Sequence, residues 1–462
     1  MKLEFDVAVV GGGPAGMMAA ASAAKLGART VLLEKNAKLG RKLMITGKGR
    51  CNVCNQCDVQ SFIGAIPGNG RFLYSAVNRF SPLDTMDYFE GLHVPLKTER
   101  GNRVFPVSDR AADIVDAMKE DVEASGVHVL QEDIKALIIK DGAVKGVKAA
   151  SGKRIQSDSV IVACGGLSYP GTGSTGDGYR LARQAGHTIV PPRPSLVPLV
   201  CRENWCQELQ GLSLRNIAVQ VIDRKQGKEI YRDFGEMLFT HFGVSGPVIL
   251  SASAHMRDLS PERYEIHIDL KPGLNFEQLD LRLQRDFQKF QNRDFSNSLQ
   301  ELLPKKLIPV AVNLSGIPGE KKCHQISRQE RMNFGRLLKS LPVTISGFRP
   351  IEEAIVTAGG VSVHELSPKT MESKLVKGLF FAGEVLDVDG YTGGFNLQIA
   401  FSTGRKFYLG VTRCFQLLST VPQEPGKAQF QGVPRKMWDL FMWIPALFTG
   451  RSVFPQWNTK LI

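Results

Sequence analysis

The sequence predicts an α/β protein in which a Rossmann-like dinucleotide-binding domain is interrupted by an inserted domain. Three observations support this fold class. A buried strand, a glycine-rich turn, an Ala-rich helix and a second strand follow one another at the N-terminus. Near residue 191 a proline-rich stretch gives way to alternating strands, and after residue 350 glycine-rich strand-to-helix segments return. A chain of 462 residues has room for two or three such domains.

Residues 5–34 have the pattern of a dinucleotide-binding unit. Residues 5–10 form an apolar run typical of a buried parallel strand, a helix is expected over 14–26, and a second strand over 30–33 ends at Glu34. Between the first strand and the helix, three glycines satisfy the G-x-G-x-x-G spacing: Gly11, Gly13 and Gly16.

Each position of this pattern has a physical task. Gly11 allows a tight turn, Gly13 lets the backbone approach a pyrophosphate, and Gly16 lets helix and strand pack closely. The helix N-terminus offers free N–H groups to the phosphates. Glu34 stands where an acid accepts hydrogen bonds from ribose hydroxyls, which argues against a 2′-phosphorylated nicotinamide here but does not separate NAD from FAD.

The segment after Glu34, KNAKLGRKLMITGKGRCNVCN, resembles a loop of a known flavoprotein family. The family is that of the BaiN-like, or aminoacetone-oxidase-type, NAD(P)/FAD-dependent oxidoreductases, in which a "GxKxxxSGxGRCNxTN" loop lies against FAD. Cys54 stands where that family usually has threonine. The matching positions are Gly40, Lys42, Thr46, Gly47, Gly49, Arg50, Cys51 and Asn52.

Further segments resemble the same family in the same order, so that the resemblance covers about residues 5–405. They are 103–106, 160–166 with Cys164 in place of threonine, 235–250 (GEMLFTHFGVSGPVIL), 352–366 and 378–405. The resemblance implies a two-dinucleotide-binding-type flavoprotein whose last glycine-rich helix N-terminus faces the flavin.

The cofactor implied is FAD, and the residues expected to bind it come from all these segments. Ile134 would hold the adenine through its backbone. The full set is Gly11, Gly13, Pro14, Ala15, Gly16, Glu34, Lys35, Lys42, Thr46, Gly47, Gly49, Arg50, Cys51, Asn52, Ile134, Cys164, Gly165, Gly166, Gly383, Glu384, Gly393, Gly394, Asn396 and Leu397.

The expected domain organisation follows the change of pattern. Residues 1–190 are the first part of the FAD-binding domain and 351–405 its closing part. The insert spans 191–350, barrel-like over 191–275 and 338–350 and helical over 276–337. Residues 406–462 stay unassigned, because the resemblance stops near Arg405. The run MWDLFMWIPALF resembles an amphipathic segment of a membrane interface, but it is short and is interrupted by Asp439 and Pro445.

Two local details are predicted in the first domain. An amphipathic helix with Asp109 as its N-cap is expected to end near Gly126. GTGSTGDGYRLARQAGH contains a second G-x-G-x-x-G, but Pro170 separates it from the preceding strand and no acid ends a strand about twenty residues later. We therefore interpret these glycines as a loop near the flavin, followed by a helix that Asp177 caps.

The three cysteines in GKGRCNVCNQC have C-x-x-C-x-x-C spacing, which is compatible with a metal cradle, a redox dithiol or a cofactor-lining loop. No metal is expected, because a fourth ligand is lacking nearby and DVQSF follows where a ferredoxin-like run would continue. A dithiol of Cys51 and Cys54 stays open as an alternative to the loop.

The resemblance implies an enzyme in which NADH or NADPH reduces FAD. The activity class is reduction of ring C=C bonds conjugated to a 3-oxo group in a steroid or bile-acid-like small molecule. This chemistry needs a general acid for the α-carbon, and the candidates are His241 in LFTHFG and Tyr391 in DGYTGG. A flavin-dependent amine oxidase that makes hydrogen peroxide and an RNA-modifying flavoprotein are the alternatives.

Composition and net charge limit the kinds of partner that we expect for this protein. A hydrophobic share of 43% and a charged share of 22% are typical of a soluble globular protein, and no long uncharged apolar run would span a bilayer. The net charge of +13 attracts polyanions, but acids lie between the basic residues, so no nucleic-acid partner is expected. Eight sparse cysteines and the absence of a signal-like start predict a cytoplasmic protein; the oligomeric state is left open.

Overall fold

The main sheet has the parallel strands that the N-terminal pattern predicts. The computed structural model describes residues 3–406, so almost all of the unassigned segment 406–462 lies outside the described residues. Within this range the sheet has seven strands in the order β6-β2-β1-β9-β8-β7, with β18 paired to β9. The strands are β1 (Leu3–Val10), β2 (Thr30–Glu34), β6 (His128–Gln131), β7 (Ile134–Lys140), β8 (Ala143–Ala149), β9 (Arg154–Val162) and β18 (Leu379–Phe381).

The neighbours of β1 place the glycine turn at the carboxyl edge of the sheet. β1 pairs in parallel with β2 and with β9, β2 pairs in parallel with β6, and β9 pairs in parallel with β18, so five strands end at the same edge. β7, β8 and β9 are antiparallel and are joined by turns at Asp141-Gly142 and Ser151-Gly152, as predicted. Ligands bind beyond the carboxyl ends of such parallel strands.

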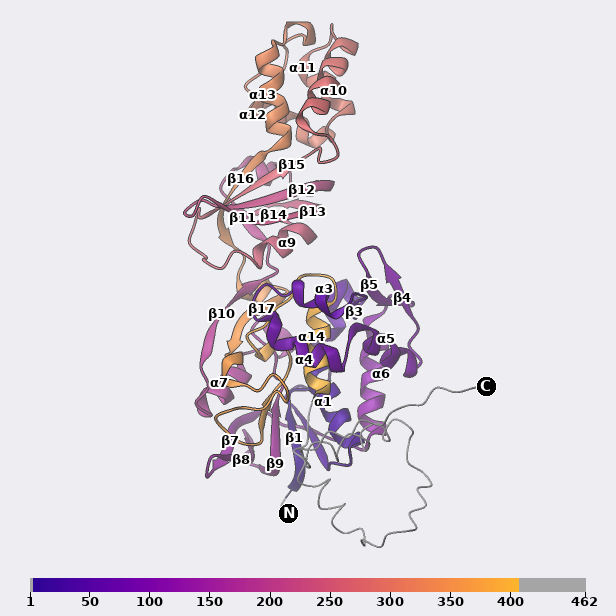
Figure 1. Ribbon diagram of the computed structural model, residues 1–462, viewed down its shortest axis with the longest axis vertical. Helices are drawn as coiled ribbons and strands as arrows, with labels where there is room; N and C mark the ends of the chain where they lie inside the picture. Colours follow the sequence, from indigo (N-terminus) through magenta and orange to yellow (C-terminus); the bar gives the residue numbers. More distant parts are fainter. Residues whose placement is uncertain (1–2, 407–462) are drawn as a thin grey trace, which may run out of the picture. The chain divides into compact units, whose positions relative to one another are not determined.

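Helices pack on this sheet, and the helix nearest the end of the described chain lies against the first helix (Figure 1). Apolar side chains of the strands and covering helices, among them Val31, Leu33, Val160 and Ile399, form one buried core. The helices of this part are α1 (Pro14–Lys25), α2 (Arg41–Ile45), α3 (Val59–Gly64), α4 (Gly70–Arg79), α5 (Pro82–Gly91), α6 (Ala111–Ala124), α7 (Asp177–Gln184) and α14 (Phe395–Arg405).

Two small sheets complete this part of the chain. One sheet has three strands in the order β3-β5-β4, and the other is the antiparallel pair β10-β17. The chain enters the insert after β10 and returns from it through β17. The prolines of β10 are tolerated because the pair has only two strands and its register shifts between Val190 and Arg193. The bounds are β3 (Cys54–Asn55), β4 (Leu96–Glu99), β5 (Arg103–Pro106), β10 (Ile189–Ser195) and β17 (Val356–Val361).

The insert contains a closed six-stranded barrel in the order β11-β14-β13-β12-β15-β16 (Figure 1). Its alternating strands LRNIAVQVID and RYEIHIDL lie in β12 and β15, as predicted. The strands and the two short helices beside them are β11 (Leu199–Cys201), α8 (Trp205–Glu208), β12 (Ser213–Asp223), β13 (Lys228–Thr240), β14 (Gly243–Ser245), α9 (Pro247–Ser253), β15 (Tyr264–Asp269) and β16 (Leu341–Phe348).

A group of helices lies between β15 and β16 and shares a hydrophobic core with the barrel. Leu279 and Leu283 of the first helix and Phe334 of the last are buried in it. These helices are α10 (Phe276–Lys289), α11 (Phe295–Ser298), α12 (Ile308–Ser315) and α13 (Arg328–Lys339). Short 3₁₀ helices occur at Thr46–Gly49, Pro170–Thr172, Leu299–Glu301, Lys305–Leu307, Cys323–Gln325, Ile351–Glu353, Val363–Glu365 and Gly383–Val385.

Two predicted helix caps are wrong. Arg110 is the N-cap of α6, and the Asp109 carboxylate instead pairs with Arg50 at 2.6 Å and Lys97 at 2.8 Å. Gly176, at φ 78°, is the N-cap of α7, and Asp177 is the first helical residue. In both places a nearby cation competes with the backbone for the carboxylate.

Candidate functional site

A cavity of 1270 Å³ lies at the carboxyl edge of the main sheet. Most of its wall comes from the Rossmann-like part, and six lining residues come from the barrel domain: Asn216, Phe234, Gly235, Glu236, Pro247 and Leu250. Small-molecule sites usually measure about 300–1,000 Å³. This cavity therefore has room for a dinucleotide cofactor and for a second ligand beside it.

The glycine turn fits a bound dinucleotide. A Cβ on Gly11 would lie 2.5 Å from Ala163 O, and a Cβ on Gly16 would collide with Gly11 O, so both positions require glycine for packing. Gly13 differs, because it lines the cavity and a Cβ there would meet nothing within 4 Å. No side chain caps α1, so its first N–H groups are free for a pyrophosphate.

Glu34 ends β2 at the cavity wall, as the pattern predicts. Its Oε2 accepts a hydrogen bond from Gly12 N at 2.7 Å, and its Oε1 accepts from Asn36 N at 2.8 Å and Asn36 Nδ2 at 2.6 Å. These contacts fix the carboxylate, and Oε2, which accepts only one hydrogen bond, keeps lone-pair capacity for a ribose hydroxyl. Asn36 is a site residue that the sequence reasoning missed.

Lys35 and Asp177 form an ion pair across the cavity wall, with 2.6 Å between Nζ and Oδ2. Burial raises the pKa of Asp177, but hydrogen bonds from Lys35, Thr175 and Arg180 outweigh burial and lower the pKa to about 2. The Arg180 guanidinium also donates to Ile134 O at 2.9 Å. Ile134 lines the cavity, and its carbonyl is already engaged by Arg180.

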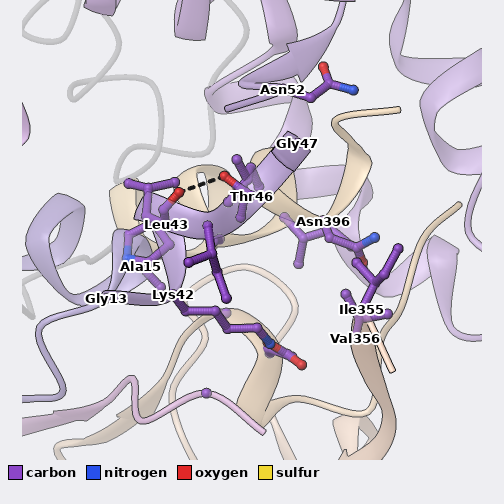
Figure 2. A pocket seen from close by; sticks show the side chains of 18 of the residues that line it. Gly13, Ala15, Lys42, Leu43, Thr46, Gly47, Asn52, Ile355, Val356 and Asn396 are labelled. Atoms are coloured by element: carbon purple, nitrogen blue, oxygen red, sulfur yellow. Dashed lines mark hydrogen bonds and ion pairs between the residues drawn. The ribbon is translucent and has the colours of Figure 1, made fainter. Parts of the chain in front are cut away.

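Lys42 joins three distant segments at the cavity. Its ammonium lies 2.6 Å from Glu384 Oε2 and donates to Ser168 Oγ at 2.5 Å. Glu384 in turn accepts a hydrogen bond from Thr357 N at 2.8 Å. Figure 2 shows Lys42 and Thr46 on one wall, Ala15 of α1 nearby and Asn396 of α14 facing them.

Arg50 lines the cavity, but its guanidinium is already paired. It lies 2.5 Å from Glu99 and 2.6 Å from Asp109, and it stacks over Phe105 at 4.2 Å from the ring centroid. Hydrogen bonds to Glu99 and Asp109 raise the pKa of Arg50. Arg50 thus fixes the loop that carries Thr46 and Gly47 more directly than it reaches for a ligand.

The cysteines of the loop are not activated thiols. Cys51 and Cys54 are fully buried, burial raises the pKa of Cys51 to about 12, and burial also raises the pKa of Cys54. A reactive dithiol needs an accessible thiolate, so the geometry does not favour the dithiol alternative. Within residues 3–406 no group of three or more His, Cys, Asp or Glu side chains has the arrangement of a metal site.

The N-terminus of α14 closes the cavity opposite the glycine turn. A Cβ on Gly394, at φ 99°, would collide with the backbone of Cys54, so this close approach requires glycine. The Asn396 amide accepts from Gly390 N at 2.9 Å and donates to Gly390 O at 2.8 Å, which fixes the preceding loop. No side chain caps α14, so the backbone N–H groups of its first turn would stabilise a negative charge placed near this helix N-terminus.

Tyr391 is the predicted acid that the structure places in the cavity wall. Its hydroxyl lies 2.7 Å from His255 Nε2, and burial followed by the charges of Asp233 and Asp389 raises its pKa. His255 was not predicted, because nothing in the local sequence AHMRD connects it with a tyrosine far along the chain. His241, the other candidate, is exposed beside Phe242 and is absent from the cavity wall.

Most of the residues expected to bind FAD line this cavity. Gly16, Gly49, Cys51 and Gly166 are not among the lining residues. Five basic side chains at the cavity form no ion pair with any residue in the range 3–406: Lys38, Arg41, Lys48, Arg100 and Arg103. They were not predicted as a set, because they come from two segments that lie far apart in the sequence, residues 38–48 and 100–103.

The parallel sheet, glycine turn, terminal acid and barrel insert define an FAD-binding Rossmann-like fold, the fold of a class of flavoprotein oxidoreductases. The model of the HI0933-like protein Rossmann domain family matches residues 5–407. The chain therefore belongs to this family, as the resemblance in its sequence predicts.

Three similar proteins cover nearly the same length. The 3-dehydro-bile acid delta(4,6)-reductase of Clostridium scindens is 31% identical over 86% of this chain and 97% of its own. The ribosomal RNA dihydrouridine synthase of Haemophilus influenzae is 32% identical over 88% of this chain and 98% of its own. That of Escherichia coli is 32% identical over 87% and 96%.

None of the helices in the range 3–406 combines the length and apolar character needed to cross a membrane.

Proposed function

We propose that this chain is an FAD-dependent enzyme that reduces a ring C=C bond conjugated to a carbonyl group, with NADH or NADPH as the electron donor. The observation that carries the proposal is the Tyr391 phenol in the wall of a cavity large enough for FAD and a second ring. When bound, FAD supplies a hydride at N5 of its reduced form. The chain supplies the pocket, the cofactor contacts and a proton at Tyr391 Oη.

The residues expected to hold FAD divide by position. The backbone at Gly13 and Ala15 suits the pyrophosphate, Glu34 suits a ribose, and the first backbone N–H groups of α14, at and near Asn396, suit the flavin. Lys42 adds a cation near this ring, held by Glu384. These roles are part of the proposal.

The names of the relatives favour the same reaction type. A bile acid delta(4,6)-reductase saturates a ring C=C bond conjugated to a 3-oxo group, and a dihydrouridine synthase saturates the uracil C=C bond conjugated to a carbonyl. Our first candidate substrate is a steroid or bile-acid-like small molecule. Its reduction would take place in the cytoplasm, the predicted location.

A second candidate substrate is a uracil ring in RNA, and a specific observation favours it. Lys38, Arg41, Lys48, Arg100 and Arg103 line the cavity without an acidic partner among the described residues. Unpaired cations suit the phosphates of a polyanion better than an apolar ring. The sequence predicts no nucleic-acid partner, whereas these cations favour one. The experiment below therefore tests an RNA oligomer beside a steroid.

The test is anaerobic mixing of the purified, FAD-loaded protein with NADH and, separately, with NADPH. We expect one of them to bleach the flavin absorbance. Addition of a 3-oxo-Δ4,6 steroid or of a uracil-containing RNA oligomer should then restore it, and the product should gain two hydrogen atoms by mass spectrometry.

The Tyr391→Phe variant is the matched control. It should bleach at the wild-type rate, because the nicotinamide step does not need the phenol, and should pass electrons to the acceptor about 100-fold more slowly or worse. Failure of both nicotinamides to reduce the flavin would refute the proposal. So would turnover of an amine with oxygen to hydrogen peroxide without nicotinamide, which is the signature of an amine oxidase.

A further inference from the structure

A cluster of two half-buried rings, His255 and Tyr391, and the buried ring of Tyr231 lies at the cavity wall. His255 Nε2 is 2.7 Å from Tyr391 Oη, and the two ring centroids are 5.5 Å apart. On the other side, the His255 ring packs on Tyr231 with centroids 4.7 Å apart and planes 34° from parallel. Tyr231 donates from its hydroxyl to Asp233 Oδ2 at 2.8 Å.

This cluster joins the two parts of the molecule. His255 follows α9 and Tyr231 lies in β13, both in the barrel domain, whereas Tyr391 belongs to the loop before α14. The backbone of Tyr391 is fixed from the Rossmann-like part, since its N–H donates to Ala65 O at 3.1 Å and its carbonyl accepts from Asn396 Nδ2 at 3.2 Å. Only the hydroxyl end of Tyr391 depends on the barrel domain for its hydrogen bond.

We propose that His255 is the positioning residue of the proton donor Tyr391, donating a hydrogen bond from Nε2–H to the phenol oxygen. This inference rests on the proposed function and deepens it. His255 is not a lining residue of the cavity, so it acts on substrate only through Tyr391.

The protonation state of His255 suits this role. Burial, followed by the charge of Arg257, lowers the pKa of His255, so the imidazole is neutral near pH 7 and carries one N–H. A neutral imidazole that donates from Nε2 leaves the phenol O–H free to point toward the cavity. The charged and titratable groups around the pair are Arg257, Tyr231, Asp233 and Asp389.

The β-carbon of the conjugated C=C bond would receive a hydride from bound reduced FAD, and the nicotinamide would supply the two electrons that reduce it. The α-carbon then takes the proton from Tyr391, so the O–H bond breaks and a C–H bond forms. The phenolate that remains keeps the hydrogen bond from His255 Nε2–H and regains a proton from water, while His255 itself neither gains nor loses one.

Two substitutions of His255 separate the hydrogen bond from the packing. His255→Phe keeps a ring against Tyr231 but has no N–H, whereas His255→Gln keeps a donor without the ring. The exposed His364 provides a control, His364→Gln. All variants should retain wild-type FAD content, because none of these side chains lines the cavity.

The expected kinetic result is a slower transfer from reduced enzyme to acceptor. Loss of one hydrogen bond to a developing phenolate should slow this step about tenfold in His255→Phe. His255→Gln should recover part of the rate, and His364→Gln should match wild type. An equal loss in the Phe and Gln variants would overturn the inference, because packing alone would then explain both.

A second readout does not depend on turnover. In holoenzyme labelled at the tyrosine Cζ carbon, the Tyr391 signal is assigned by its loss in Tyr391→Phe and titrated by NMR. We expect the phenol to ionise at a higher pH in His255→Phe than in wild type, because the donor that stabilises the phenolate is gone. An unchanged titration would overturn the inference. If wild type reduces no conjugated C=C bond at all, the proposed function fails, and the titration still decides whether His255 controls Tyr391.

Discussion

His187 shows how a single buried residue makes stability depend on pH. Its ring nitrogens contact Glu365 Oε2 at 3.0 Å and Ser373 Oγ at 2.7 Å, and its side chain is 0% exposed. Burial lowers the pKa of His187, and the opposing effect of Glu365 is smaller. Ser373 Oγ also accepts hydrogen bonds from Leu375 N and Val376 N. The His187–Ser373 pair is therefore part of a structural hydrogen-bond network, and Ser373 is not a nucleophile.

We predict that the free energy of unfolding decreases as the pH falls below the usual histidine pKa of 6.5 toward the lower pKa of the folded state. In that window the unfolded chain binds a proton at His187 and the folded chain does not. The slope from one such group is at most about 1.4 kcal/mol per pH unit. Urea unfolding at pH 7 and pH 5.5 measures it.

The comparison variant is His187→Gln, which should be less stable at pH 7 but should lose less stability between the two pH values than wild type. His364→Gln, at an exposed histidine, should keep the wild-type pH dependence. Equal pH dependence in wild type and His187→Gln would contradict the assignment.

At the scale of single residues, the sequence predicts the roles of those residues that depend only on the local pattern of strand, turn and helix around them. Gly11, Gly13 and Glu34 could be placed because a strand, a turn and a helix follow them within one short segment. His255 could not, because its partner Tyr391 comes from a distant segment and meets it only in the folded chain. The sequence predicts Asp109 as a helix cap, because it does not show that Arg50 and Lys97 lie close to this carboxylate in the folded chain.

At the scale of elements, the N-terminus of α1 provides a matched pair of glycines. Gly13 has φ −81°, which alanine adopts easily, and its Cβ would enter the open cavity. Gly16 packs so closely on Gly11 O that any Cβ collides. One position thus tests cofactor approach and the other tests packing of the helix on the sheet.

We predict that Gly13→Ala changes the stability of the FAD-free protein by less than about 1 kcal/mol but weakens FAD binding about tenfold or more, because its methyl group occupies the place of the pyrophosphate. Gly16→Ala should lower the stability of the FAD-free protein by about 1–3 kcal/mol through overpacking. Urea unfolding and flavin fluorescence titration give the two quantities. Wild-type FAD affinity in Gly13→Ala would contradict the placement of the cofactor.

The elements themselves follow the sequence closely where periodicity is strong. The strand, helix and strand of residues 3–34 and the alternating strands β12 and β15 were predicted from local pattern. Closure of the six strands into a barrel was predicted only as barrel-like, because β11 and β14 have three residues each and carry no periodic signal. The pairing of β10 with β17 was hidden by the prolines in β10.

At the scale of the whole molecule, net charge and the unpaired cations of the cavity make the two candidate substrates distinguishable. The chain carries a net charge of +13, and Lys48 and Arg100 line the cavity as exposed cations. If RNA is the substrate, its affinity should fall with added salt, with log K changing by about −0.7 per log unit of salt for each phosphate that a cation neutralises on a single strand. A steroid-like substrate should show little of this dependence.

We predict that Lys48→Gln combined with Arg100→Gln makes the salt slope shallower by about 0.7 for each phosphate that is no longer neutralised. Lys145→Gln, at an exposed lysine of β8 outside the cavity wall, is the control and should leave the slope unchanged. Fluorescence anisotropy of a labelled uracil-containing oligomer over a salt series measures it. Absence of binding at low salt would remove RNA as a candidate.

The packing of α14 against α1 has a consequence for how the protein is made. The cavity needs the glycine turn from the start of the chain and Gly394 with Asn396 from near residue 400, with the whole barrel domain encoded between them. A ribosome delivers these pieces in order, so the nascent chain exposes the turn long before its opposite wall exists. Tight capture of the cofactor is therefore a late event in biosynthesis, and a nascent chain stalled before α14 should hold FAD poorly even when its barrel domain has already folded.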